Sequence, residues 1–303
     1  MVGVVMTDRD RYDLRGPVQS VRFEFEYIDP QTGDWEPLKR GPALTFDRDG
    51  REAGRPQDDG LTSTTVDERG LRTTIGPRAP FVPRQPMMVY GVGVDGAAAS
   101  DVLTRYDAHD RPAEIVHRDS AQKALYRIQL AYDDAGRIVR EQVLMGDPSD
   151  VEGSWLFDRA KAGAQRLTAE QREEAVAAFK ALMPDGVLST REYVYDDRGR
   201  VVPLLERMGL VSETRHSYTY DVHDNVVETH CEESHREVAM DGEGNLITSN
   251  ESSDESWQRY EYRYDERGNF IERVVSGRSV PDLDFHRAVV ERRTISYFDQ
   301  AAK

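Results

Sequence analysis

A short pattern centred on an aspartate is repeated along most of this 303-residue chain. It begins with an aromatic or apolar residue, continues with Asp, two variable residues and Gly or Asp, and in most copies then has Arg or Asn. Several copies are about 20 to 26 residues apart, a period typical of stacked repeat units, so the pattern constrains the architecture more than composition does. The eight copies have their aspartates at Asp47, Asp67, Asp107, Asp133, Asp196, Asp221, Asp241 and Asp265.

The residue types of the pattern are those that a tight hairpin turn requires. An Asp at the start of a turn can accept a hydrogen bond from a backbone N–H two residues on, and a Gly three residues later supplies a positive φ. Two copies have Asp110 and Asp224 at the Gly position, and Asp is one of the few other residues that adopt this conformation. The residues before the turn alternate, as in Tyr193-x-Tyr195, which places each aromatic set on one strand face. We therefore expect stacked hairpins with an aromatic ladder.

The Tyr-Asp-x-x-Gly-Arg/Asn turns at Asp133, Asp196 and Asp265 resemble the YD repeat of the Rhs family. That family includes the shells of bacterial Rhs and Tc toxins and the teneurins. The resemblance covers roughly residues 44 to 275 and is interrupted by one insertion. It implies that the hairpins are wall material, and it implies a bacterial toxin, secretion or immunity setting. A shared fold does not by itself carry an activity.

The predicted fold class is all-β: a single-layer, curled antiparallel sheet of tandem YD-repeat hairpins. A sheet of so many strands is expected to twist and curl. One α-helix is expected at about residues 168–183, because Thr168 to Gln171 form a capping box and apolar residues follow at helical spacing. Near the end of the chain, Arg292 and Arg293 are expected on an exposed closing strand.

We expect one YD-repeat domain over residues 1–303. Its predicted parts are an N-terminal cap at 1–43, first repeats at 44–146 with a Pro/Gly-rich loop at 76–96, a helical insertion at 147–187, second repeats at 188–275 and a C-terminal closing strand at 276–303.

The formal charge of −16 disfavours nucleic acid and anionic membranes as partners. Residues 224–255 hold ten acidic residues and a single arginine. This run is either a solvated edge or a docking surface for a basic protein partner. In the second case Glu232, Glu233 and Glu237 are the candidate partner-binding residues, together with Phe179 on the apolar face of the expected helix.

Four of the seven histidines lie close to the lone cysteine, Cys231. They are His216, His223, His230 and His235. A hairpin that turns at Asp221 would place His216 opposite His230, a possible metal pair, although a one-residue change of register removes it. Histidines are also ordinary on solvated strand faces, and no metal site is assigned.

Known catalytic and cofactor motifs are missing, and no cofactor or catalytic residue is assigned. Gly91, Gly93 and Gly96 match the spelling of a dinucleotide-binding loop, but the next repeat follows without room for the helix and strand which that site needs. Carboxylate pairs suited to glycoside hydrolysis stay open, because 56 acidic residues supply many. Whether the chain is an enzyme is undecided, with the pattern favouring a non-enzyme.

The lack of a recognisable targeting signal predicts a protein that is cytoplasmic as synthesised. A single cysteine excludes an intrachain disulfide, and Met1 to Met6 are too few apolar residues for a secretory signal before Asp8. No stretch approaches the ~20 apolar residues of a membrane helix. Export by a dedicated secretion system stays open.

Three functions are compatible with these observations. The first is a non-catalytic binding or scaffold protein that presents its sheet to a protein partner. The second is an enzyme or lectin-like binder that acts on a glycan or peptide along the aromatic face. The third is a structural fragment of a larger Rhs-type shell.

Overall fold

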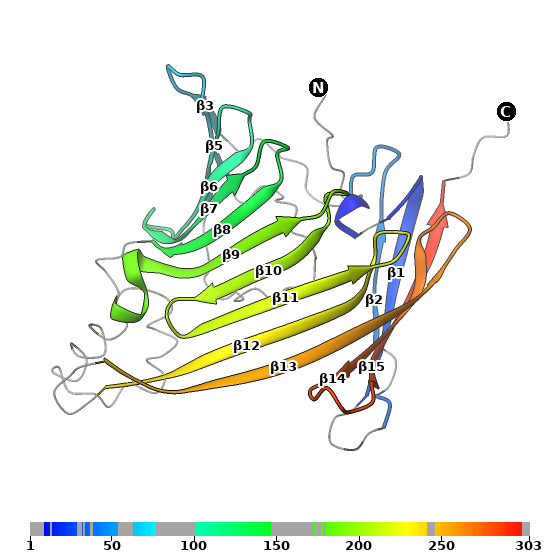
Figure 1. Ribbon diagram of the computed structural model, residues 1–303. Helices are drawn as coiled ribbons and strands as arrows, with labels where there is room; N and C mark the ends of the chain where they lie inside the picture. Colours follow the sequence, from blue (N-terminus) through cyan, green and yellow to red (C-terminus); the bar gives the residue numbers. More distant parts are fainter. Residues whose placement is uncertain are drawn as a thin grey trace. The chain divides into compact units, whose positions relative to one another are not determined.

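The computed structural model describes residues 9–12, 14–28, 32, 34–36, 39–53, 63–76, 101–146, 173, 177, 180–240 and 246–298. Its strands form one antiparallel sheet of 15 strands (Figure 1), which confirms the predicted all-β class. The strand order is β2-β1-β15-β14-β13-β12-β11-β10-β9-β8-β7-β6-β5-β4-β3, so β2 and β3 stand at its two ends. From β3 to β15 each strand therefore lies beside the next in the chain, as tandem hairpins require.

The strands vary in length, and the longest pair, β12 and β13, carries the acidic run. Their bounds are β1 (Val18–Tyr27), β2 (Lys39–Thr45), β3 (Ser63–Val66), β4 (Arg72–Gly76), β5 (Asp101–Tyr106), β6 (Pro112–Arg118), β7 (Ala124–Tyr132), β8 (Ile138–Met145), β9 (Val187–Tyr195), β10 (Val201–Met208), β11 (Ser212–Tyr220), β12 (Val226–Met240), β13 (Leu246–Tyr264), β14 (Phe270–Arg278) and β15 (His286–Tyr297). Two short 3-10 helices, η1 (Arg9–Tyr12) and η2 (Pro184–Gly186), complete the described elements.

The last strand is not an edge, contrary to the sequence-based expectation. β15 pairs with β14 on one side and with β1 on the other, so the first and last strands of the chain are neighbours (Figure 1). Arg292 lies opposite Glu24 and bonds Glu26 at 2.8 Å, while Arg293 is buried. β1 thus pairs with the strand that was expected to be an edge, and the side chains of Arg292 and Arg293 are 39% and 7% exposed.

The chain divides into two compact units. Unit 1 comprises Met1–Gln57, Tyr218–His230 and Glu255–Lys303, and unit 2 comprises Asp58–Ser217 and Cys231–Asp254. The core of unit 1 includes Leu14, Val18, Val21 and Phe46. The single-domain organisation stays a prediction.

On β5, β6 and β7 of unit 2, successive side chains alternate between two faces of the sheet. Thr104, Ile115 and Ile128 are paired across β5, β6 and β7 and are 1%, 2% and 8% exposed. The residues next to them face the opposite way, and Arg105, Glu114 and Gln129 are paired across the same strands. We call this second surface the polar face of unit 2.

Parts of the predicted insertion are described. Within residues 168–183, Glu173, Ala177 and residues 180–182 are helical. Phe179 lies outside the described residues, as do residues 77–96 of the Pro/Gly-rich loop and the repeat copy at Asp241. Among the described residues no helix is long and apolar enough to cross a membrane.

Leu204 tests the buried face because its side chain is completely enclosed. Leu204→Ala should lower the free energy of unfolding by about 2–5 kcal/mol through lost burial and an unfilled cavity. Urea unfolding followed by circular dichroism measures the change. Leu210→Ala is the control, since Leu210 is 50% exposed and should change stability by no more than about 0.5 kcal/mol. Equal effects of the two substitutions would contradict the assignment of the buried face.

Candidate functional site

The repeated turn is a corner held by one aspartate. At Asp133 the backbone N–H donates to the carbonyl of Arg137 at 2.9 Å, and the N–H of Gly136 donates to the carbonyl of Asp133 at 3.0 Å. The Asp133 carboxylate accepts the N–H of Arg137 at 2.8 Å, and Gly136 has a φ of 80°. The carboxylate therefore fixes the point at which the chain enters the next strand.

The same three bonds recur at every described copy of the repeat. The corners are those of Asp47, Asp67, Asp107, Asp133, Asp196, Asp221 and Asp265. Asp110 and Asp224 adopt φ values of 60° and 65° at the glycine position, which confirms the predicted turn chemistry.

One corner of this type, at Asp119, does not follow the repeated sequence pattern. Asp119 bonds Lys123 and Gln122 through its backbone and accepts the Lys123 N–H on its carboxylate at 2.9 Å. Gln122 takes the left-handed position with a φ of 64°. This turn joins β6 to β7 and lacks both the aromatic residue and the glycine of the pattern, so only its Asp was available as a signal.

In the copies at Asp107 and Asp133, the arginine that ends the turn joins its corner to the following repeat. Arg137 donates to the Asp133 carboxylate at 2.8 Å, and its guanidinium lies over the ring of Tyr195 at 4.5 Å. Tyr195 in turn donates its hydroxyl to the carbonyl of Ile138 at 2.6 Å. A cation–π contact of this kind contributes about 0.5–1 kcal/mol at exposed sites.

The preceding corner repeats this arrangement. Arg111 bonds Asp107 and lies 4.4 Å from the ring centre of Tyr132, whose hydroxyl donates to Pro112 at 2.7 Å. Burial, followed by the charge of Asp107, raises the pKa of Tyr132 to about 12. At these corners the expected aromatic ladder is a ladder of arginine on tyrosine.

In copies that end in asparagine, the next tyrosine bonds the corner aspartate itself. The Asn225 amide donates to the Tyr264 hydroxyl at 2.8 Å, and that hydroxyl donates to the Asp221 carboxylate at 2.5 Å. The same three residue types form the same bonds at Asp265. At these four corners, the Arg or the Asn that ends the turn therefore has the same role: it contacts the tyrosine of the following repeat.

Each unit also contains a buried cluster of three charged side chains. In unit 2, Arg191 bonds Glu141 at 3.2 Å and Glu206 at 2.9 Å, and the side chains of Arg191 and Glu141 are only 5% and 2% exposed. Burial works to lower the pKa of Arg191, but the two glutamates outweigh it and raise the pKa. The strand alternation could have indicated this cluster, because charged residues occupy inward positions there.

The cluster in unit 1 has the opposite polarity. Glu291, whose side chain is 4% exposed, bonds Arg273 at 2.5 Å and Arg293 at 2.8 Å. Such clusters are weak evidence for stability, because desolvation offsets much of the attraction between the charges.

The histidines do not gather into one site. His216 on β11 lies opposite Leu204 on β10, and burial lowers the pKa of His216. A bond of 2.8 Å from the Arg236 N–H to the Val211 carbonyl sets the register of β12, which places His216 opposite Cys231 rather than His230. The one-residue shift that removes the expected pair is therefore present.

His230 belongs to unit 1, stacks on Trp257 at 4.7 Å and bonds Glu255 at 3.3 Å. In the part of the chain that the structure describes, no three metal-ligating residues are grouped.

The acidic candidates are also separated. Glu232 and Glu233 are neighbours on β12, so their side chains face opposite ways. Glu232 is exposed, whereas Glu233 bonds His235 at 3.1 Å. The side chains of Glu237 and Phe179 lie outside the described residues. Partner binding by these four residues stays a prediction.

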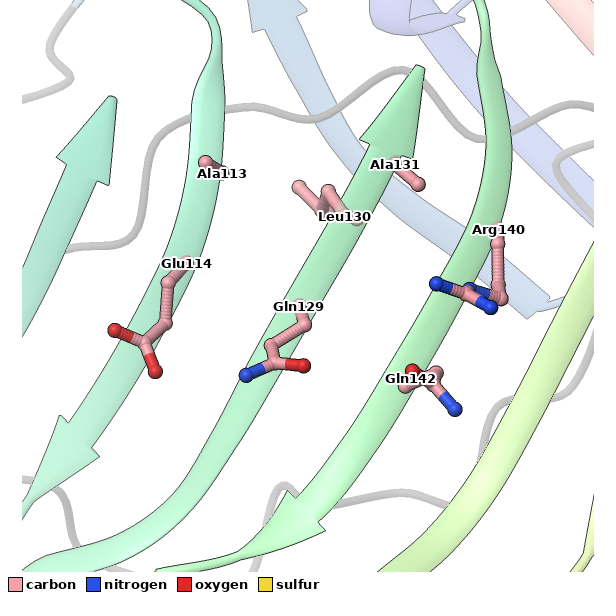
Figure 2. A pocket seen from close by; sticks show the side chains of 7 residues that line it. All are labelled: Ala113, Glu114, Gln129, Leu130, Ala131, Arg140 and Gln142. Carbon is pink, nitrogen blue, oxygen red and sulfur yellow. The ribbon is translucent and has the colours of Figure 1, made fainter. Parts of the chain in front are cut away.

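A shallow hollow of about 320 Å³ lies on the sheet of unit 2 (Figure 2). Figure 2 shows Glu114 on β6, Gln129 on β7 and Gln142 on β8 aligned across the three strands. The lining residues are Ala113, Glu114, Gln129, Leu130, Ala131, Arg140 and Gln142. The hollow thus lies where a row of polar side chains crosses the sheet.

No family model matches this chain, and a search of curated proteins finds no match. A porin-like protein from Bacteroides uniformis ATCC 8492 shares 10% identity over 93% of this chain and 99% of its own, with a TM-score of 0.41. A porin-like protein from Bacteroides vulgatus ATCC 8482 shares 12% identity over 93% and 98%, with a TM-score of 0.33. A Photorhabdus luminescens Tc holotoxin pore shares 14% identity over 81% of this chain and 11% of that chain, with a TM-score of 0.32. At these values the similarities assign neither a family nor an activity.

The left-handed position of the corner can be tested at Gly136. Gly136→Ala should lower the free energy of unfolding by about 1–2 kcal/mol, because a Cβ is disfavoured at a φ of 80°. The substitution tests strain alone, since the nearest atom to the added Cβ is the Arg111 guanidinium at 3.6 Å. Gly277→Ala, at a strand glycine without positive φ, is the control and should not destabilise. A harmless Gly136→Ala would refute the corner geometry.

The corner carboxylates also predict a pH dependence. The Arg200 backbone N–H, followed by its side chain, lowers the pKa of Asp196. A lowered folded-state pKa contributes stability above the unfolded value of about 3.9, and this contribution is lost as pH falls through the folded value. Asp196→Asn should therefore reduce the loss of stability between pH 6 and pH 2.5 in urea titrations. An acid-induced loss as large as that of the unsubstituted protein would exclude this role.

Proposed function

We propose that the chain is a YD-repeat module that serves as a non-catalytic scaffold and binds a protein partner at β3, the edge beyond which no other described strand pairs. The observation that supports this function is the contrast between the two edges of the sheet. Corner side chains are already engaged in holding the sheet together, so binding is expected at edges and faces. β3 is the edge whose chemistry suits an added strand.

The edge strand β2 carries devices that discourage pairing. Its sequence includes Lys39, Arg40 and Pro42, and its register with β1 is interrupted between Arg22 and Glu24. Lysine, proline and bulges are the features with which edge strands avoid further partners.

The edge strand β3 has none of these features. Its residues, 63–66, are Ser-Thr-Thr-Val, all exposed, and they pair with β4 in unbroken register. Val66 is 63% exposed. Uncharged β-branched residues on an open edge favour the addition of an extended segment.

The hydrogen bonds of the adjoining corner define which residues of β3 are available. The Asp67 N–H donates to the Leu71 carbonyl, and hydrogen-bonded pairs then alternate along the hairpin. Thr65, opposite Thr73, therefore bonds β4, whereas Thr64 directs its N–H and carbonyl outward. An added strand would bond Thr64 and Val66.

The charge distribution specifies the chemistry of the partner. The sequence places Asp58 and Asp59 before β3 and Glu68 after it, within a chain of charge −16. We infer an extended partner segment with an uncharged β-branched centre and basic flanks. The Rhs resemblance supports a bacterial toxin, secretion or immunity setting for this partner.

The structure supports the two alternative functions, a shell fragment and a glycan or peptide binder, to different extents. The same open edge favours the alternative of a shell fragment, because a further hairpin would pair there equally well. Binding of a glycan along the aromatic face is disfavoured, since Tyr193, Tyr218 and Tyr260 are only 7%, 8% and 6% exposed and their rings are not available for stacking.

A labelled peptide with a Val-Thr-Val-Thr centre and two lysines at each end tests the proposal. It should bind the full chain at low salt in fluorescence anisotropy, and Thr64→Pro should weaken binding about tenfold, or ~1.4 kcal/mol. The proline removes the outward N–H of Thr64 and leaves the bonds to β4 intact.

Thr64→Val is the matched control and should retain binding, because its backbone is unchanged. The unfolding temperature of both variants verifies that they are folded. Peptide binding that is absent, or that is equal in Thr64→Pro and Thr64→Val, would exclude strand addition at β3. Concentration-dependent self-association that Thr64→Pro abolishes would instead support the shell alternative.

A further inference from the structure

We propose that the hollow on β6–β8 binds a small, carboxylate-bearing molecule through Arg140, Gln129 and Gln142. The site lies on the polar face of unit 2, away from β3, and does not depend on the partner proposed there. Its volume of about 320 Å³ is at the lower end of the range for small-molecule sites.

The strand register brings these side chains together. Gln129 lies opposite Gln142, and Arg140 lies opposite Ala131, so the four residues form two adjacent rows on one face. Ala131 has only a methyl group, which leaves open space next to the Arg140 guanidinium. Figure 2 shows Arg140 and Gln142 next to one another on β8, with Gln129 and Ala131 on β7.

The charge at the hollow differs in sign from that of the whole chain. Glu114 is already paired with Arg105 and lies 3.9 Å from Arg127. The hollow and its rim therefore carry three arginines, Arg140 included, against two carboxylates, Glu114 and the cross-strand Glu192. A local positive charge in a protein of charge −16 favours an anionic ligand.

Arg140 is the group available for that ligand. Its side chain is exposed, and none of the ion pairs formed among the described residues involves it. Glu192 lies opposite it on β9, but Glu192 bonds Arg207 at 3.1 Å. A guanidinium presents a planar fork of donors that matches a carboxylate with two parallel hydrogen bonds.

The two glutamines define the rest of the ligand. Gln129 is exposed, and among the described residues Gln142 makes one long bond of 3.4 Å, to Thr190. Each amide offers donors and an acceptor, which suit hydroxyl or amide groups next to a carboxylate. Sugar acids and N-acylated acidic amino acids share this chemistry, and both have a size that fits the hollow.

Titration calorimetry of the full chain with glucuronate and with N-acetylglutamate tests the proposal. At least one of them should bind, while glucose, which lacks the carboxylate, should not. Arg140→Gln should weaken binding about tenfold, or ~1.4 kcal/mol. Arg215→Gln is the matched control, because Arg215 is exposed on β11, outside the hollow, and takes part in no ion pair among the described residues.

The pattern of binding identifies the ligand class. Binding of glucuronate alone supports a sugar acid, binding of N-acetylglutamate alone supports an acylated amino acid, and equal binding of both supports recognition of the carboxylate. Failure of both ligands to bind would overturn the proposal. Glucose binding as tight as that of either acid, or equal losses in Arg140→Gln and Arg215→Gln, would also overturn it. Circular dichroism confirms that both variants fold, and peptide binding at β3 should be unchanged in Arg140→Gln.

Discussion

The carboxylate of the corner aspartate is the group on which the rest of the sheet depends. A strand enters the sheet in register only if the preceding turn ends at a defined residue, and one slipped residue would exchange the buried and polar faces. The bond from the corner carboxylate to the N–H four residues on sets that point at each described copy. The second oxygen then engages Arg, or the next tyrosine, and so connects consecutive hairpins.

The sequence could predict the bonds within a turn, but it could not predict the contacts between one repeat and the next. The turns depend on residues close in sequence, so the pattern was sufficient for the corner at Asp133 and for Asp110 and Asp224 at positive φ. The contact of Arg137 with Tyr195 crosses from one repeat to the next, over an insertion, and depends on spatial neighbours. Spacing alone could not reveal it.

The candidate sites also depend on contacts between strands, which the sequence alone does not define. The histidine pair required the register of β12 to be known to one residue, and sequence does not provide that accuracy. Arg140 and Gln129 come together only through the pairing of β7 with β8, and the edge position of β3 follows only from the complete strand order. The repeat builds the sheet, whereas residues outside the repeated pattern give its edge and its polar face their chemistry. The two proposed binding functions therefore lie at those two places.

The central claim is that an arginine of one corner stabilises the tyrosine of the next. A double-mutant cycle on Arg137 and Tyr195, with Arg137→Ala, Tyr195→Leu and the double variant, tests it most directly through the free energy of unfolding. The cation–π contact predicts a coupling energy of about 0.5–1 kcal/mol, since either substitution alone already removes it. Strictly additive effects would show that the corners are independent and would contradict the account.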